Sequence, residues 1–332
     1  PHAQYQLARM IFNDPSSTPE QTAQALERLT KAAEAGQDCA QYALGKIYRD
    51  GQGVEKDIQK AVALFTLAAT KENSFAAFAL GKLYLAGDAA LPRDPAAALK
   101  WLTYAAELGN QFAQYRLGKL LLKGDDGIPK DVITAIRWLT AAAKQENGYA
   151  EYVLALVYLT GEDAPKDSVK ALSLLKRSAG RGNQFAQYRL GKLLLQGEDA
   201  PKDVKAAIRW LTAAAEQGNQ YAQYALGKLY LLGKEVPKDR SSAIKWFQLA
   251  ADQGNEYAQY FLKHMDDRLG QPPVAAVISL FHHLANIFQE QNQPPPSGGV
   301  RVAVDRKLLR KIKAKKIAQG HKADDHEPEM QL

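Results

Sequence analysis

Two serine–lysine pairs in the 332-residue sequence have a spacing that can support nucleophilic catalysis. Ser173 precedes Lys176 by three residues, and Ser242 precedes Lys245 in the same way, so both pairs fit the pattern S-x-x-K. The S-D-N and K-T-G segments that accompany this pattern in penicillin-recognising enzymes do not occur in the sequence. Lys or Arg takes the place of Ser173 in other copies of the repeat described below, which indicates an outward position. We therefore predict no catalytic residue and disfavour a serine hydrolase of the β-lactamase type.

Residues near the C-terminus include side chains of metal-ligating types. His321 and His326 flank Asp324 and Asp325, and imidazole and carboxylate groups both bind divalent metals. A short polar segment at a chain end is more typical of a solvated tail, so we predict no metal site and no cofactor. The single cysteine, Cys39, excludes an intramolecular disulfide and fits a reducing compartment.

Five lysines recur at one position of a repeated motif and define the main candidate binding surface. Each follows the glycine of A-Q-Y-x-L-G-K or a close variant; Leu156 takes this place in one repeat, and Arg116 and Arg189 lie three residues before two of the lysines. At 100° per residue the position falls on the solvated arc of a helix between two apolar faces. The row is either a solvated face or a groove for an acidic peptide or a phosphate backbone. These residues, the lysine ladder, are Lys46, Lys82, Lys119, Lys192 and Lys228.

The C-terminal segment concentrates positive charge. The formal net charge of the chain is +7 at pH 7, and residues 300–322 hold nine Lys and Arg against one Asp, whereas residues 323–332 are acidic. If residues 300–317 are helical, their apolar side chains fall on one face. Three functions stay open for this segment: a solvated tail, contact with DNA, or binding to an anionic membrane or partner helix. The basic residues of this candidate site are Arg306, Lys307, Arg310, Lys311, Lys313, Lys315 and Lys316.

An internal repeat positions these residues. Its opening alanine recurs in steps of 36 or 37 residues, and six copies are complete. A period this regular is typical of a helical solenoid, in which each unit buries its apolar face only by stacking on its neighbours. The opening alanines are Ala3, Ala40, Ala76, Ala113, Ala150, Ala186, Ala222 and Ala258.

Each repeat is predicted to contain two helices. In the first, Ala222, Leu226 and Tyr230 have the four-residue spacing of one apolar stripe. Gly227 and its equivalents imply close contact with another helix, because glycine within a helix costs about 1 kcal/mol relative to alanine. A further glycine closes this helix, and the Asp of P-K-D, such as Asp239, caps the second helix. The second helix is predicted to end at Gly-Asn or Glu-Asn.

The combined motif resembles a known family. A-x-Y-x-L-G-x-L-Y-x-x-G, then P-K-D, then W-x-x-x-A-A-x-x-G-N closely resembles the Sel-one-like repeat, a tetratricopeptide-related helical hairpin, over about residues 3–262. This resemblance implies an all-α, right-handed superhelical solenoid of antiparallel helix pairs. It also implies an adaptor or assembly scaffold whose groove binds a protein or peptide. Some secreted relatives carry a cysteine pair in each repeat, and Cys39 alone departs from that pattern.

A second resemblance concerns the tail. The segment KKIAQGHKADDH, residues 315–326, resembles the C-terminal ending of bacterial relaxase (mobilisation) proteins, some of which carry Sel-one-like repeats after their nicking domain. It implies that the chain is the C-terminal part of a larger bacterial protein linked to DNA mobilisation, with any nicking chemistry upstream of Pro1. The alternative is a stand-alone adaptor that has no nucleic-acid role.

The predicted organisation has four parts. Residues 1–267 form the array, whose first repeat is truncated, and residues 272–291 form a C-terminal capping helix. Residues 292–299 form a Pro/Gly linker, and residues 300–332 form a mostly disordered tail. No run approaches the roughly 18 apolar residues that a membrane-spanning helix needs. We therefore predict no membrane span, and the single cysteine favours a cytoplasmic protein.

Overall fold

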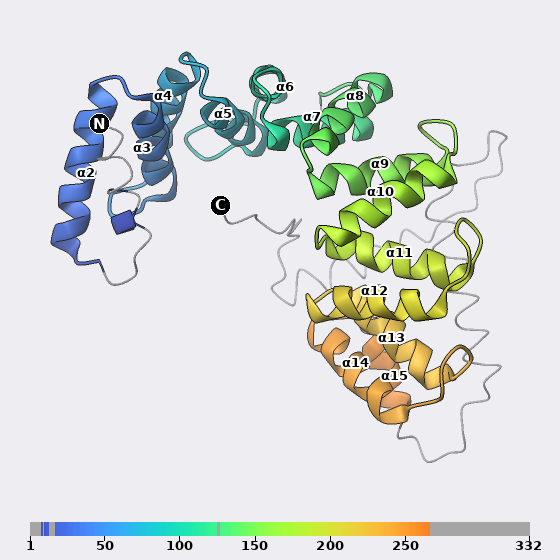
Figure 1. Cartoon of the computed structure of the whole chain (residues 1–332). Helices are drawn as coiled ribbons and strands as arrows, with labels where there is room; N and C mark the ends of the chain where they lie inside the picture. Colours follow the sequence, from blue (N-terminus) through green and yellow to red (C-terminus); the bar gives the residue numbers. More distant parts are fainter. Residues whose placement is uncertain (1–7, 9, 13–16, 125–126, 266–332) are drawn as a thin grey trace, which may run out of the picture. The chain divides into compact units, whose positions relative to one another are not determined.

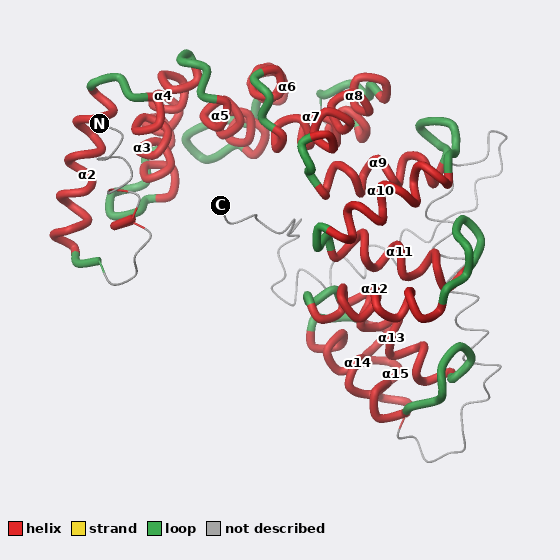
Figure 2. The backbone as a smooth tube through the Cα atoms, in the orientation of Figure 1, coloured by secondary structure: helices red, strands yellow, loops and turns green. Residues whose placement is uncertain are grey.

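The computed structural model describes residues 8, 10–12, 17–124 and 127–265. The chain divides into two units, Pro1–Asp266 and Asp267–Leu332, and all described residues belong to the first unit. Their secondary structure is helical apart from one isolated bridge between Asp88 and Leu91 (Figures 1 and 2). The predicted capping helix, linker and tail lie outside the described residues.

The described helices alternate between two kinds, which we call A and B. The A helices are α3 (Asp38–Asp50), α5 (Ser74–Ala86), α7 (Gln111–Lys123), α9 (Gly148–Thr160), α11 (Gln184–Gln196), α13 (Gln220–Leu232) and α15 (Glu256–Met265). The B helices are α2 (Pro19–Glu34), α4 (Ile58–Ala69), α6 (Pro95–Glu107), α8 (Val132–Lys144), α10 (Ser168–Gly180), α12 (Val204–Glu216) and α14 (Arg240–Asp252). Each A helix from α3 to α13 packs against the B helix before it and the B helix after it. The predicted solenoid of helix pairs is confirmed.

Short polar side chains determine where the helices begin. Asp203 accepts a hydrogen bond from the backbone N–H of Ala206 at 2.9 Å, and Asp residues cap α4, α6, α8, α10 and α14 in the same way. The predicted Asp caps are therefore confirmed. Asn219 accepts from the N–H of Ala222 at 3.0 Å at the start of α13. The sequence interpretation assigned the Gly-Asn pairs to the ends of B helices. The asparagine belongs instead to the A helix that follows, because its side chain accepts one of that helix's free amides.

Glycine allows the two helices of a repeat to touch. A Cβ on Gly191 would lie 2.7 Å from Cγ of Leu211, and one on Gly227 would lie 2.7 Å from Cδ1 of Phe247. Both distances are shorter than non-bonded carbon atoms adopt, so only glycine fits at these positions. The predicted close contact between the two helices is therefore confirmed. Ala155 holds this position in α9 and is fully buried.

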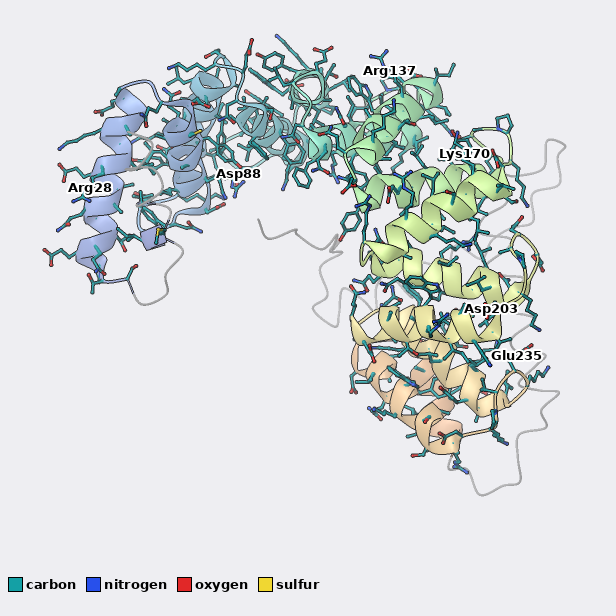
Figure 3. The ribbon with its side chains drawn as sticks, in the orientation of Figure 1. Arg28, Asp88, Arg137, Lys170, Asp203 and Glu235 are labelled. Atoms are coloured by element: carbon teal, nitrogen blue, oxygen red, sulfur yellow. The ribbon has the colours of Figure 1, made fainter. Side chains whose placement is uncertain are left out.

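Ion pairs join the loops of successive repeats. Nζ of Lys166 lies 2.8 Å from Asp199, and Nζ of Lys202 lies 2.8 Å from Glu235. Equivalent pairs join Lys56 to Asp88 and Lys130 to Asp163. Glu235 is labelled in Figure 3 beside the loop that connects α13 to α14. These half-exposed pairs add little stability individually, but they give successive loops a common register.

Candidate functional site

The lysine ladder lies on A helices that begin at equivalent positions. Asn caps start α5, α7, α9, α11 and α13, and α3 begins at the same motif position after Gln37, so a given motif position recurs at the same height on each helix. Each ladder lysine follows a motif aromatic residue by four positions and therefore shares its face. Nζ of Lys46 lies 6.0 Å from the ring centroid of Tyr42, and Nζ of Lys192 lies 5.7 Å from that of Tyr188.

The ladder lysines are less solvated than the sequence interpretation assumed. Lys82 is exposed, whereas the other four are half-buried. The difference arises because neighbouring rings cover part of these side chains, as Tyr42 does for Lys46 and Tyr188 does for Lys192. Burial lowers the pKa of Lys192, and Arg189 adds to this effect. Burial also lowers the pKa of Lys228, with smaller contributions from Lys192 and Lys234. Cations of adjacent repeats thus lie close enough to repel one another.

A row of aromatic rings runs beside the lysines. In each repeat the ring two residues after the opening alanine contacts the ring one residue before the opening alanine of the next repeat. The centroids are 5.9 to 6.4 Å apart, within the range of favourable aromatic pairs. We call these rings the aromatic ladder and the shared surface the ladder face. The pairs are Tyr42–Phe75, Phe78–Phe112, Tyr115–Tyr149, Tyr152–Phe185, Tyr188–Tyr221 and Tyr224–Tyr257.

Sequence reasoning missed half of the aromatic ladder. It treated Tyr224 and its equivalents as packing residues and did not examine the position before the opening alanine. Phe75 and Tyr221, at that position, are 46% and 52% exposed. The signal was present in the sequence, because every A helix from α5 to α15 has Phe or Tyr there. Burial raises the pKa of Tyr188 to about 12 and also raises the pKa of Tyr224.

The ladder face changes character at α9. Arg116 on α7 and Arg189 on α11 correspond to Val153 on α9, and Leu156 replaces the ladder lysine there. Val153 and Leu156 are both half-buried. The Nε of Arg189 is buried and has no hydrogen-bond acceptor among the described residues. The two cationic stretches are therefore separated by one apolar step.

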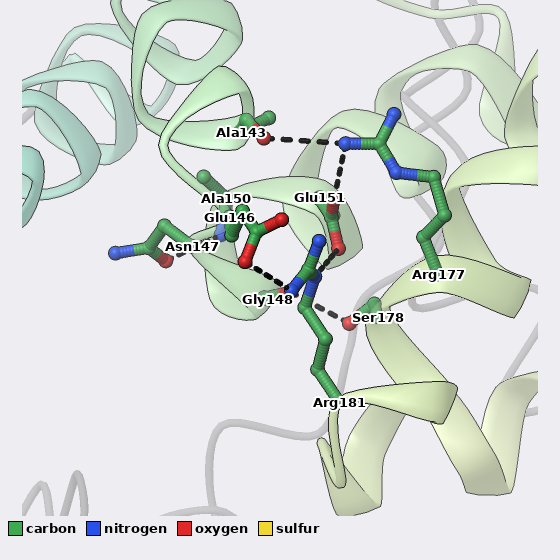
Figure 4. Close-up of polar contacts among 9 residues, drawn as sticks. All are labelled: Ala143, Glu146, Asn147, Gly148, Ala150, Glu151, Arg177, Ser178 and Arg181. Carbon is green, nitrogen blue, oxygen red and sulfur yellow. Dashed lines mark hydrogen bonds and ion pairs between the residues drawn. The ribbon is translucent and has the colours of Figure 1, made fainter.

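A buried ion cluster lies in the same repeat (Figure 4). Glu151 on α9 is fully buried, with Oε1 2.5 Å from Nη2 of Arg177 and Oε2 3.4 Å from Nε of Arg181. Arg177 also donates to the carbonyl of Ala143 at 3.2 Å, and Arg181 pairs with Glu146 at 2.9 Å. The cluster joins α8, α9 and α10.

Neutral glutamines occupy the equivalent place in most other repeats. Gln187 donates to the carbonyl of Ala179 at 3.1 Å and accepts at 2.7 Å from Gln217, which follows α12 in the same repeat. Gln114 and Gln223 make the same pair of contacts. Glu151 cannot donate, so Arg177 supplies the bond to the carbonyl. The cluster is thus an ionic form of a repeated structural contact and lies apart from the ladder face.

The structure describes the two serine–lysine pairs but not the candidate sites of the tail. Ser173 and Lys176 are both exposed on α10, and Oγ of Ser242 donates to the capping Asp239 at 2.6 Å. Residues 300–332, which hold the seven basic tail residues and His321 and His326, lie outside the described residues. Within the described ranges, no group of three or more His, Cys, Asp or Glu is arranged to hold a metal ion.

The described residues also form hollows in two other places. One, of about 650 Å³, opens between α4 and α6 and is lined mainly by Ala69, Leu99, Trp101 and Tyr104. The other, of about 540 Å³, lies among loop residues that include Lys56 and Asp88. Neither contains a residue of the lysine ladder. No described helix combines the length and the apolar composition required to cross a membrane.

The repeat architecture agrees with a known family. The sequence model of the Sel1 repeat matches residues 1–37, 40–73, 74–110, 111–147, 148–183, 184–219 and 220–255. The chain therefore belongs to the Sel1 repeat family. Proteins of this family are generally protein-interaction scaffolds. No curated protein matches the chain.

Two solved structures support the same fold. A protective antigen of uropathogenic Escherichia coli with an SLR fold is 34% identical, with a TM-score of 0.68 over 81% of this chain and 57% of the antigen. A Sel1 repeat protein from Oxalobacter formigenes is 32% identical, with a TM-score of 0.68 over 80% of this chain and 76% of that protein. The match thus covers little more than half of the antigen's own length.

Proposed function

We propose that the protein is a non-catalytic scaffold that binds an acidic segment of a partner protein across the ladder face. The observation that supports this proposal is a row of cations, four of the five ladder lysines half-buried, beside partly exposed aromatic rings. Burial lowers the pKa of Lys192 and Lys228, because their charged forms have lost part of their hydration. A carboxylate from a partner compensates for that loss, while the rings supply apolar contact area.

Peptide display tests this proposal. A random peptide library is selected on the immobilised chain at low salt, and the selected peptides are expected to be acidic. Replacement of all five ladder lysines by Gln is expected to weaken their binding at least tenfold. The affinity of the wild-type chain should also fall as salt rises, because exposed charges are screened.

A matched variant controls for net charge. Five exposed lysines on B helices are replaced by Gln instead, which removes the same charge from other surfaces; they are Lys100, Lys144, Lys176, Lys205 and Lys245. This variant is expected to keep the binding of the selected peptides within about twofold. Equal binding by the ladder variant and the wild-type chain overturns the proposal, provided that circular dichroism shows both to be folded.

We infer a second candidate function for the tail from its charge. Residues 300–322 carry nine Lys and Arg against one Asp, a density that supports phosphate contact, and the resemblance of residues 315–326 suggests the C-terminal part of a bacterial DNA-mobilisation protein. In this proposal the protein acts in the cytoplasm. Labelled duplex DNA should bind the full chain, with an affinity that falls as salt rises, and binding should disappear when residues 300–322 are deleted. Absence of DNA binding at low salt favours an adaptor without a nucleic-acid role.

A further inference from the structure

The interruption of the ladder face at α9 restricts what the face can recognise. On one side lie Arg116 and Lys119, on the other Arg189 and Lys192, and between them α9 presents Leu156 and its neighbour Val153. Resting on the proposed function, we propose that this part of the face recognises a partner segment with one apolar residue at its centre and an acidic residue on either side.

The geometry of the helices sets the spacing of that segment. The rings of Tyr115 and Tyr149 join α7 to α9 at 6.0 Å, and those of Tyr152 and Phe185 join α9 to α11 at 6.2 Å. Helices in contact have axes about 8–10 Å apart, and an extended chain advances about 3.3 Å per residue. One step between A helices therefore corresponds to roughly three residues, so the two acidic residues lie about six residues apart.

The change in hydration on binding explains why each position of the ladder face prefers one kind of partner side chain. A carboxylate opposite Leu156 loses water without gaining a cation, which is unfavourable, whereas an apolar side chain there is removed from water. At α11 a carboxylate is favoured instead, because Arg189 and Lys192 are both half-buried cations on this helix and Arg189 adds to the lowering of the pKa of Lys192. A carboxylate at that point is a charge partner for both cations.

The apolar interruption at α9 also distinguishes between a peptide and a nucleic acid as the partner. Phosphates follow one another at a regular spacing along a strand, so a strand laid across α7, α9 and α11 places charge opposite Val153 and Leu156. A protein segment has no such constraint, because any of its residues can be apolar. The pattern of this face therefore favours a peptide.

Two labelled peptides of about 13 residues test the inference by fluorescence anisotropy. Both carry an aspartate about three residues before and after the centre in a Gly/Ser background, and the central residue is Leu in one peptide and Asp in the other. The wild-type chain is expected to bind the Leu-centred peptide at least fivefold more tightly. Leu156→Lys, which completes the lysine ladder, is expected to abolish or reverse this preference. Four of the five other complete repeats carry a half-buried Lys at this position, so the fold accommodates it.

Val169→Lys is the matched control, because it adds the same charge at an exposed position of α10, the B helix of the same repeat. It should leave the preference unchanged. Equal binding of both peptides to the wild-type chain, or an unchanged preference in Leu156→Lys, overturns the inference. If the Asp-centred peptide still binds in a way that depends on the five ladder lysines, the proposed function survives alone. If neither peptide binds at low salt, the inference fails; the proposed function fails with it if a single-stranded oligonucleotide binds more tightly than either peptide through the same lysines.

Discussion

Oε1 of the fully buried Glu151 lies 2.5 Å from Nη2 of Arg177 on the following helix. The pair replaces the glutamine contact of neighbouring repeats, and Arg177 takes over the bond to the carbonyl of Ala143. A buried carboxylate persists only while it is compensated, and the loss of one partner of a buried pair costs several kcal/mol. The fold of this repeat therefore depends on both residues together.

Arg177→Ala is expected to lower the free energy of unfolding by roughly 2 kcal/mol. This loss of stability is smaller than that expected when a fully buried ion pair is broken, because Arg177 is half-exposed and Arg181 stays near Glu151. Addition of Glu151→Gln should recover most of the loss, because the amide can donate to the carbonyl of Ala143 as Gln187 does to that of Ala179. Urea unfolding of the single and double variants measures the coupling. A loss from Arg177→Ala that is equally large with Gln at position 151 contradicts this explanation.

The sequence predicted the elements of the fold because its signals are local to one repeat. The caps formed by Asp203 and its equivalents, and the close contact at Gly191, depend on residues within one helix pair. The sequence interpretation assigned the asparagines to the B helix that precedes them, although they cap the A helix that follows. Gly-Asn follows a B helix directly in sequence, whereas the side chain of Asn219 bonds to the helix after it.

The candidate site was predicted less completely because its contacts cross repeats. Tyr188 and Tyr221 lie on different A helices, so the apolar stripe of a single helix does not reveal their contact. The half-burial of Lys192 depends on these rings. The role of Glu151 was missed for a different reason: it depends on Arg177, which lies in the same repeat but 26 positions along the chain and on another helix. Alignment of one position across all repeats was the signal that could have revealed both features.

Substitution by alanine is expected to have opposite effects on stability at two helical glycines, of which only one lies in a contact between paired helices. Gly191→Ala is expected to destabilise the protein by about 1–2 kcal/mol, because overpacking against Leu211 outweighs the gain in helix propensity. Gly180→Ala on α10 is the matched control, because a Cβ there meets no atom within 4 Å; it should stabilise by up to about 1 kcal/mol. Thermal or urea unfolding checks both. A stabilising Gly191→Ala would show that the helices separate freely, as the natural Ala155 permits in its own repeat.

Two glutamates adopt a backbone conformation that suits glycine. Glu72 and Glu146 have φ values of 62° and 66° at turns where most other repeats have Gly. Glu72→Gly is expected to stabilise the protein by about 0.5 kcal/mol, since relief of the left-handed conformation exceeds the added entropy of the unfolded chain. Glu146→Gly should gain less, because it also removes the ion pair with Arg181. Urea midpoints that rank the two variants in the opposite order contradict this account.

Burial of the aromatic ladder predicts a loss of stability at high pH. The pKa of Tyr188 is raised to about 12 from an ordinary value of 10.0, so the folded phenol keeps its proton where the unfolded one has lost it. Such a group contributes full stability below pH 10, and the contribution is lost as the pH rises from about 10 to about 12; two pKa units correspond to roughly 2.7 kcal/mol.

Tyr188→Phe should therefore unfold with a free energy that falls less steeply over this pH range, while its stability near neutral pH stays within about 0.5 kcal/mol of the wild type. Urea unfolding at a series of pH values measures the difference. Tyr260→Phe, at a tyrosine that is 44% exposed on α15, is the control for loss of a hydroxyl group alone. Parallel pH profiles for the wild type and Tyr188→Phe would mean that water reaches this phenol, and the ladder face would then be more open than its ring contacts indicate.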